Sequence, residues 1–199
     1  MARHKWKFKS RFRREAYSWK GTALASKRMR EAVSEIKKAA RKDSALAGVG
    51  VIELFVRLYP ALMRIDSSSG ALGTAMNKTI NSLMPILIQA DWDMNTRGKQ
   101  LEKLYQAIVD DGWGTFDGLR DHWGEICVYP DLAHRWADQF MDCTREVLSS
   151  TSYQFSVTVD MCLSCLVYTD RYQELEELLQ LCERPFWFYH KFQAMGLVR

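Results

Sequence analysis

The chain has 199 residues, 47% of them hydrophobic and 26% charged, an ordinary globular composition that can supply one sizeable core. The longest uninterrupted apolar stretches, such as 84–88, are far shorter than the roughly 20 residues of a membrane-spanning helix, so we expect no membrane span. The charge is unevenly distributed: residues 1–42 carry 15 Lys/Arg and 3 Glu, whereas residues 43–199 carry 13 Lys/Arg and 21 Asp/Glu. The odd count of five cysteines favours reduced thiols, and we expect a cytoplasmic protein.

Residues 1–20 are predicted to form a basic aromatic arm, because the run from Lys5 to Arg14 interleaves cations with aromatic residues. Clustered cations attract phosphate-bearing polymers or an acidic protein surface, and aromatic faces can stack on unpaired bases. Alternatively, Trp6, Phe8 and Phe12 pack onto the first helix pair and the cations face water. The arm can also dock on the chain's own acidic face.

Residues 21–42 have the period of an amphipathic helix with a basic outer face. The arm and this helix together form the predicted contact surface for nucleic acid or a protein partner. Its residues are Lys5, Trp6, Lys7, Phe8, Lys9, Arg11, Phe12, Arg13, Arg14, Arg30, Lys37 and Arg41.

Further helices are predicted over 44–65, 71–89 and 95–111. Ser44 and Asn95 are the expected N-caps, and Pro60 is expected to kink or end the first of these helices near Leu58. Gly48-Val49-Gly50 lies in an apolar helical run, so it favours close helix packing over phosphate binding.

The second half continues with predicted helices over 116–127, 131–148, 154–167 and 171–182. No run shows the sustained alternation of a β-strand, so the predicted fold class is all-α. Short connections between successive helices favour stacked antiparallel hairpins, as in an α-solenoid of tetratricopeptide or HEAT type. We expect one such domain over residues 21–199.

Several segments together resemble a group of uncharacterised bacterial helical-repeat proteins of tetratricopeptide-like type. They are Arg11-Phe12-Arg13-Arg14 with Ala16-Tyr17-Ser18-Trp19, 31–38, 66–75, Trp123-Gly124-Glu125, Arg135-Trp136-Ala137-Asp138 and Arg171-Tyr172. The resemblance implies a helical-repeat scaffold and carries over no catalytic residue. Members of that group are longer and continue with further tetratricopeptide-like helix pairs, which leaves two alternatives: a complete protein or a shortened member of the group.

Two acidic trios have helical spacing: Asp117, Asp121 and Glu125, then Asp138, Asp142 and Glu146. Facing carboxylates could hold a divalent ion, which would allow a metal-dependent hydrolase, but the Glu-x-x-His pairs of such bundle sites are absent from the sequence. Solvated faces or a docking surface for the basic arm are the stronger interpretation.

Zinc is the other metal considered, because the ligand types of Cys162, Cys165, Cys182 and His190 suit it. The segment between these residues has the pattern of two regular helices. We therefore expect that the four side chains pack in the core and bind no metal, and we expect no cofactor.

No catalytic motif is present in the sequence, and we expect no enzymatic activity. The predicted function is that of a binding scaffold that contacts a polyanion or an acidic protein through its basic arm and first helix. A shortened, binding-only inhibitor of a mobile element is the alternative. Phe186, Trp187, Phe188 and Phe192 form a possible association surface for self-assembly or partner capture.

Overall fold

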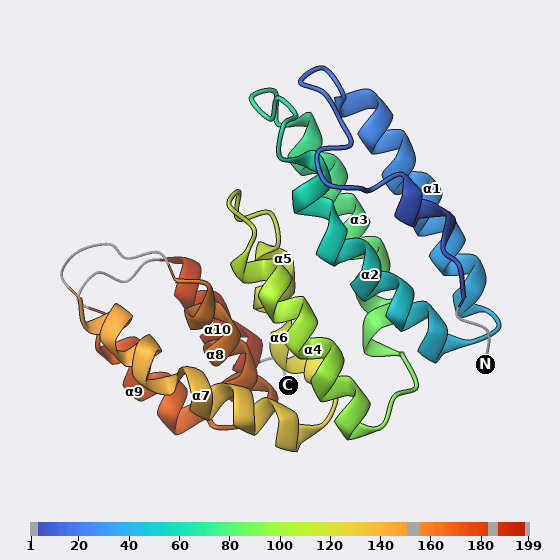
Figure 1. Ribbon diagram of the computed structural model, residues 1–199. Helices are drawn as coiled ribbons and strands as arrows, with labels where there is room; N and C mark the ends of the chain where they lie inside the picture. The colour runs from blue at the N-terminus through green and yellow to red at the C-terminus, as the bar shows by residue number, and fades with distance from the viewer. Residues whose placement is uncertain (1–3, 151–155, 183–186, 198–199) are drawn as a thin grey trace. The chain divides into compact units, whose positions relative to one another are not determined.

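The computed structural model describes residues 4–150, 156–182 and 187–197. It is 74% helix with no strand in these ranges, which confirms the all-α fold class (Figure 1). The chain divides into two compact units, residues 1–118 and 119–199. This division differs from the expected arm of residues 1–20 followed by one domain.

The N-terminal unit consists of a short 3₁₀ helix and four long α-helices. They are η1 (Lys7–Ser10), α1 (Thr22–Ala40), α2 (Ser44–Leu62), α3 (Ala71–Ile88) and α4 (Met94–Val109). Helix α2 contacts η1, α1, α3 and α4, and α1 also packs on α3. Figure 1 shows the arm in dark blue beside α1, before the chain turns into that helix.

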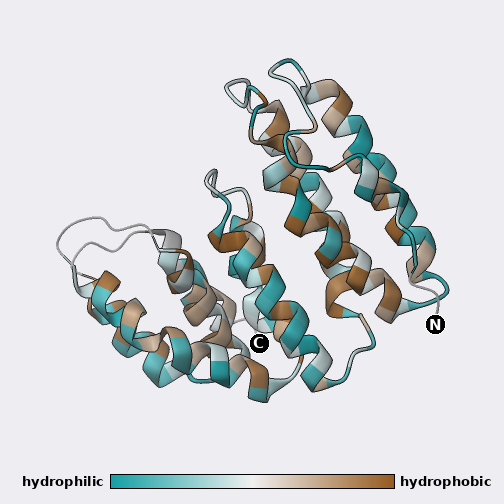
Figure 2. Ribbon diagram, in the orientation of Figure 1, coloured by the Kyte–Doolittle hydropathy of each residue, from teal (hydrophilic) through white to brown (hydrophobic). Residues whose placement is uncertain are grey.

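Helix α2 supplies the centre of this unit because it is apolar on most of its surface. Val51, Leu54, Phe55 and Leu58 are completely buried, and hydrophobic colouring runs along much of the helix in Figure 2. Within the described ranges, α2 alone is long and apolar enough to cross a membrane, and 56% of that stretch is buried inside the structure. This helix was predicted from the sequence, but its length and apolar character as a candidate span were not. The core helix of a soluble protein passes the same test.

The helix ends of this unit differ from the predicted ones by up to three residues. Asp43, and not Ser44, caps α2 by accepting a hydrogen bond from the Leu46 amide at 2.7 Å. Asp93, and not Asn95, caps α4 in the same way. Helix α2 also continues past Leu58 to Leu62, with Pro60 in its last turn, so it does not end where Pro60 led us to expect.

The C-terminal unit is built around one buried helix. Its elements are α5 (Asp117–Asp121), which begins at the boundary, α6 (Trp123–Cys127), α7 (Pro130–Ser149), α8 (Val157–Tyr168), α9 (Tyr172–Gln180) and α10 (Trp187–Leu197). Helix α8 contacts α6, α7, α9 and α10 and is buried from Val159 to Val167. The predicted helix over 116–127 is in fact two five-residue helices, and α10 follows the last helix that was predicted, over 171–182.

Candidate anion-binding site

The aromatic residues of the arm are part of the core. Trp6 is 3% exposed, and Phe8 and Phe12 are equally inaccessible. The Trp6 and Phe8 rings stack with their centroids 5.4 Å apart. The Trp6 ring also lies against Gly50 of α2, where a Cβ would come within 2.5 Å of the indole. These three aromatic residues therefore cannot stack on a base in this structure, which corrects that part of the predicted contact surface.

Three glutamates of the first two helices fix the arm in place. The backbone amides of Lys7 and Phe8 donate to the Glu35 carboxylate, at 2.8 and 3.3 Å. The Lys9 ammonium lies 2.9 Å from Glu53, and Arg11 forms an ion pair with Glu31. The arm thus docks on its own unit, through acids other than the predicted acidic trios. Glu31 and Glu35 stand one helical turn apart in an otherwise cationic helix, a signal that could have identified them.

A cavity of about 540 Å³ opens where the arm meets the start of α1. Four arginines, one glutamate and one tyrosine give it its chemical character. Its lining consists of Ser10, Arg11, Arg13, Arg14, Glu15, Ala16, Tyr17, Leu24 and Arg28. The sequence reading named Arg11, Arg13 and Arg14 for this surface, but missed Arg28 and Tyr17.

The acids around the cavity neutralise only part of its positive charge. Arg11 and Arg28 share the single carboxylate of Glu31, and the hydrogen bond from Arg28 holds the pKa of Glu31 below its usual value. Glu15 is engaged by Arg64 at 2.6 Å. Arg13 and Arg14 are exposed and form no ion pair with any residue that the structure describes. The cavity therefore keeps an excess of guanidinium groups, which suits a phosphate or carboxylate ligand.

Tyr17 adds a polar group to the cavity wall. Its side chain is 5% exposed, and its hydroxyl has no hydrogen-bond partner within the described ranges. Burial raises the pKa of Tyr17, and the positive charges of Arg28 and Arg11 oppose that rise. The phenol thus stays protonated at neutral pH, and its hydroxyl is enclosed by protein atoms.

The remaining predicted cations lie outside this cavity. Lys5 and Lys7 are exposed on the arm. Arg30 lines a separate groove of about 320 Å³ between α1 and α3, together with Lys78. Lys37 and Arg41 are exposed near the other end of α1. Of the predicted cations, the structure therefore brings together only Arg11, Arg13 and Arg14 at the cavity, where Arg28 joins them.

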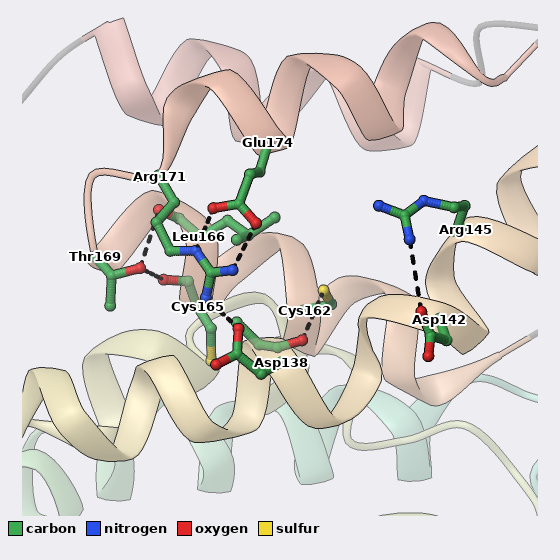
Figure 3. Close-up of polar contacts among 10 residues, drawn as sticks. Asp138, Asp142, Arg145, Cys162, Cys165, Leu166, Thr169, Arg171 and Glu174 are labelled. Atoms are coloured by element: carbon green, nitrogen blue, oxygen red, sulfur yellow. Dashed lines mark hydrogen bonds and ion pairs between the residues drawn. The ribbon is translucent and has the colours of Figure 1, made fainter.

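The two acidic trios are not organised as ligands. The first is interrupted at His122 between α5 and α6, and Asp121 is engaged by Lys191 at 2.5 Å. In the second, Asp138 pairs with Arg171, Asp142 pairs with Arg145, and Glu146 is exposed (Figure 3). In the part of the chain that the structure describes, no three His, Cys, Asp or Glu side chains come close enough to hold a metal ion.

Arg171 ties α9 to α7 through a network that is visible in Figure 3. Its Nε and Nη2 atoms both lie 2.6 Å from the Glu174 carboxylate, and Nη1 lies 2.6 Å from Asp138. The hydrogen bonds from Arg171 hold the pKa of Glu174 below its usual value. A carboxyl with a depressed pKa in the folded state stabilises the fold above its unfolded pKa, and this contribution is lost as the pH falls through the folded value.

We therefore expect Glu174→Gln to lower the free energy of unfolding at pH 7 by about 1 kcal/mol, because the charge-assisted pair is partly exposed. The difference from the wild type should shrink as the pH falls through the lowered pKa of folded Glu174, below which Glu174 is protonated in both states. Urea unfolding at several pH values measures it. Glu176→Gln, an exposed glutamate of the same helix, is the control and should show no such trend. A pH-independent difference for Glu174→Gln would contradict the expectation.

Two of the three cysteines considered for zinc lie on the buried helix α8. Cys162 and Cys165 are completely buried, and burial raises the pKa of Cys162 to about 11 and that of Cys165 well above its usual value. Both remain thiols at neutral pH. Cys182 is half-buried, and the side chain of His190 lies outside the described part of the chain.

The possible association surface at the C-terminal end changes in one respect. Phe192 of α10 is 0% exposed, so it belongs to the core of the C-terminal unit and cannot lie on a contact surface. Phe186 and the side chains of Trp187 and Phe188 fall outside the described residues.

We compared the chain with known protein families, curated proteins and solved structures. No protein-family model, curated protein or solved structure matches the chain. The resemblance to bacterial helical-repeat proteins thus stays a prediction.

Proposed function

We propose that the protein is a non-enzymatic binding scaffold whose N-terminal unit holds a polyanion at the arginine cavity. The observation that carries this proposal is the exposed pair Arg13 and Arg14, which lines the same cavity as Arg11 and Arg28 with too few acids to neutralise it. Four guanidinium groups around one cavity repel one another, and a bound anion relieves that repulsion.

The docking of the arm strengthens this proposal. A free polybasic tail would lose conformational entropy when it binds, whereas this arm is already ordered by Trp6, Glu35 and Glu53. The arginines are thus presented on a fixed backbone, where planar guanidinium groups can make paired hydrogen bonds to phosphate oxygens. We favour a phosphate polymer over an acidic protein because a narrow polymer chain can enter a cavity, whereas the flat surface of a folded protein cannot.

The proposed scaffold is a helical repeat. In each unit, the main helix packings join a helix to its first or second neighbour in the sequence, as α1 with α2 and α3, or α8 with α9 and α10. Stacked hairpins give this pattern, because each hairpin contacts the next one only. It supports a tetratricopeptide-like or HEAT-like arrangement within each unit.

The test uses inorganic polyphosphate, which carries phosphates and no bases. We expect the wild-type protein to bind it with an affinity that falls with salt, by roughly 0.7 to 0.9 decades per decade of salt for each phosphate neutralised. Arg13→Glu/Arg14→Glu should weaken binding at least about tenfold and flatten the salt dependence. Isothermal titration calorimetry at two salt concentrations measures both quantities.

Two exposed lysines of α4 supply the matched control. Lys99→Glu/Lys103→Glu makes the same change in net charge within the same unit, but away from the cavity lining. This control should bind polyphosphate nearly as well as the wild type. Equal losses in both double variants would show that net charge alone drives binding and would refute the site. Binding of polyglutamate in preference to polyphosphate would favour an acidic protein partner.

A further inference from the structure

Trp19 is an unusually exposed aromatic residue that follows Tyr17, a residue of the cavity lining, by two positions. Its side chain is 65% exposed, the largest value for a large hydrophobic side chain in the part of the chain that the structure describes. Its backbone is nevertheless held, because its carbonyl accepts a hydrogen bond from the Asp66 amide at 3.0 Å. The indole is thus presented to solvent on a fixed support, unlike the buried Trp6.

The same end of the unit carries both Trp19 and the cavity. The Glu15 amide donates to the Pro60 carbonyl at 2.8 Å, so both ends of residues 15–19 are tied to the segment that ends α2 and follows it. Tyr17, which lies within residues 15–19, and Leu24, in the first turns of α1, both line the cavity. An extended ligand can therefore contact the arginines and the indole together.

We infer that the polyanion is a single-stranded nucleic acid, with phosphates in the arginine cavity and an unpaired base stacked on Trp19. This inference rests on the proposed function. A duplex keeps its bases stacked inside, whereas a single strand exposes base faces that an aromatic ring can cover. The four arginines that line the cavity supply the hydrogen-bond donors for the phosphate oxygens.

Two interpretations of Trp6, Phe8 and Phe12 were open from the sequence, base stacking or packing onto the first helix pair, and all three residues are buried. In this inference Trp19 takes the role of the stacking residue. The interleaved pattern of residues 5–14 therefore serves two separate purposes: its aromatic residues anchor the arm, and its arginines face the cavity.

Binding of oligo(U) of about 15 nucleotides, a duplex of equal length and inorganic polyphosphate tests the inference by fluorescence anisotropy and calorimetry. We expect Trp19→Ala to weaken oligo(U) binding about tenfold to a hundredfold, since each stacked base contributes that much. Polyphosphate binding should be unchanged, and Trp19→Phe should retain most of the oligo(U) affinity. Met94→Ala, an exposed apolar residue of α4, is the control and should have no effect.

The outcomes separate the two proposals. If the wild type binds neither oligo(U) nor polyphosphate, the proposed function fails and this inference fails with it. If polyphosphate binds but Trp19→Ala leaves oligo(U) affinity unchanged, or the duplex binds as tightly as oligo(U), only the inference on single strands is overturned. Binding to vesicles that contain phosphatidylserine could also be tighter than binding to oligo(U) and be lost in Trp19→Ala. That result would show that the indole inserts into a membrane surface, and it would overturn the inference on single strands.

Discussion

Replacing Trp6 by alanine is expected to lower the free energy of unfolding of the N-terminal unit by about 3–5 kcal/mol, the range for truncating a large buried aromatic side chain. The reason is its position: the indole is 3% exposed, stacks on Phe8 and lies directly against the α2 backbone at Gly50. Removing it leaves a cavity between the arm and the central helix. Urea unfolding, with hydrogen exchange of α1 and α2 to identify the unit that unfolds, measures the loss.

Trp19→Ala is the matched control for this prediction, because it makes the same substitution in the same arm at a solvent-exposed site. It should change stability by no more than about 0.5 kcal/mol. A second variant approaches the contact from the other side: Gly50→Leu would push side-chain atoms into the Trp6 ring and should also destabilise this unit. Stability close to the wild type in both Trp6→Ala and Gly50→Leu would show that the arm is not part of the fold.

The arm illustrates what the sequence could and could not predict. Helical periodicity placed most helices correctly, because burial of one face depends on nearby spacing that the sequence displays directly. It could not decide between the two interpretations of Trp6, Phe8 and Phe12, because a base and a helix surface both accept an aromatic ring. That choice depended on Gly50, more than 40 residues away, which leaves room for the indole.

Charges were harder to place than helices. The sequence reading attached importance to Asp117, Asp121, Asp138 and Asp142 for their regular spacing, yet the acids that hold the arm are Glu31, Glu35 and Glu53. Regular spacing of acids identifies a common helix face and says nothing about which cation reaches it. The cavity itself, formed where the arm turns into α1, arises from tertiary contacts that the sequence alone does not show.

The buried ion pair between Arg120 and Asp160 gives the second large expected effect, in the C-terminal unit. Their side chains are 3% and 5% exposed, and Arg120 Nη2 lies 3.4 Å from Asp160 Oδ2. Asp160→Leu leaves the guanidinium buried without this carboxylate, so we expect a loss of about 3–5 kcal/mol in the free energy of unfolding.

The double variant Arg120→Met/Asp160→Leu removes both charges and should recover most of the stability that Asp160→Leu loses, because desolvating an ion pair costs nearly as much as the attraction returns. Arg145→Met is the control in the same unit, since its pair with Asp142 is largely exposed and should contribute less than about 1 kcal/mol. Urea unfolding, with hydrogen exchange of α8, compares the four proteins. If Asp160→Leu cost no more than Arg145→Met, or if the double variant were no more stable than Asp160→Leu, burial of the charge would not be the cause. The expected recovery would show that each of these charges is tolerated in the core only when the other is present. It would also show that the helices can pack without either charge.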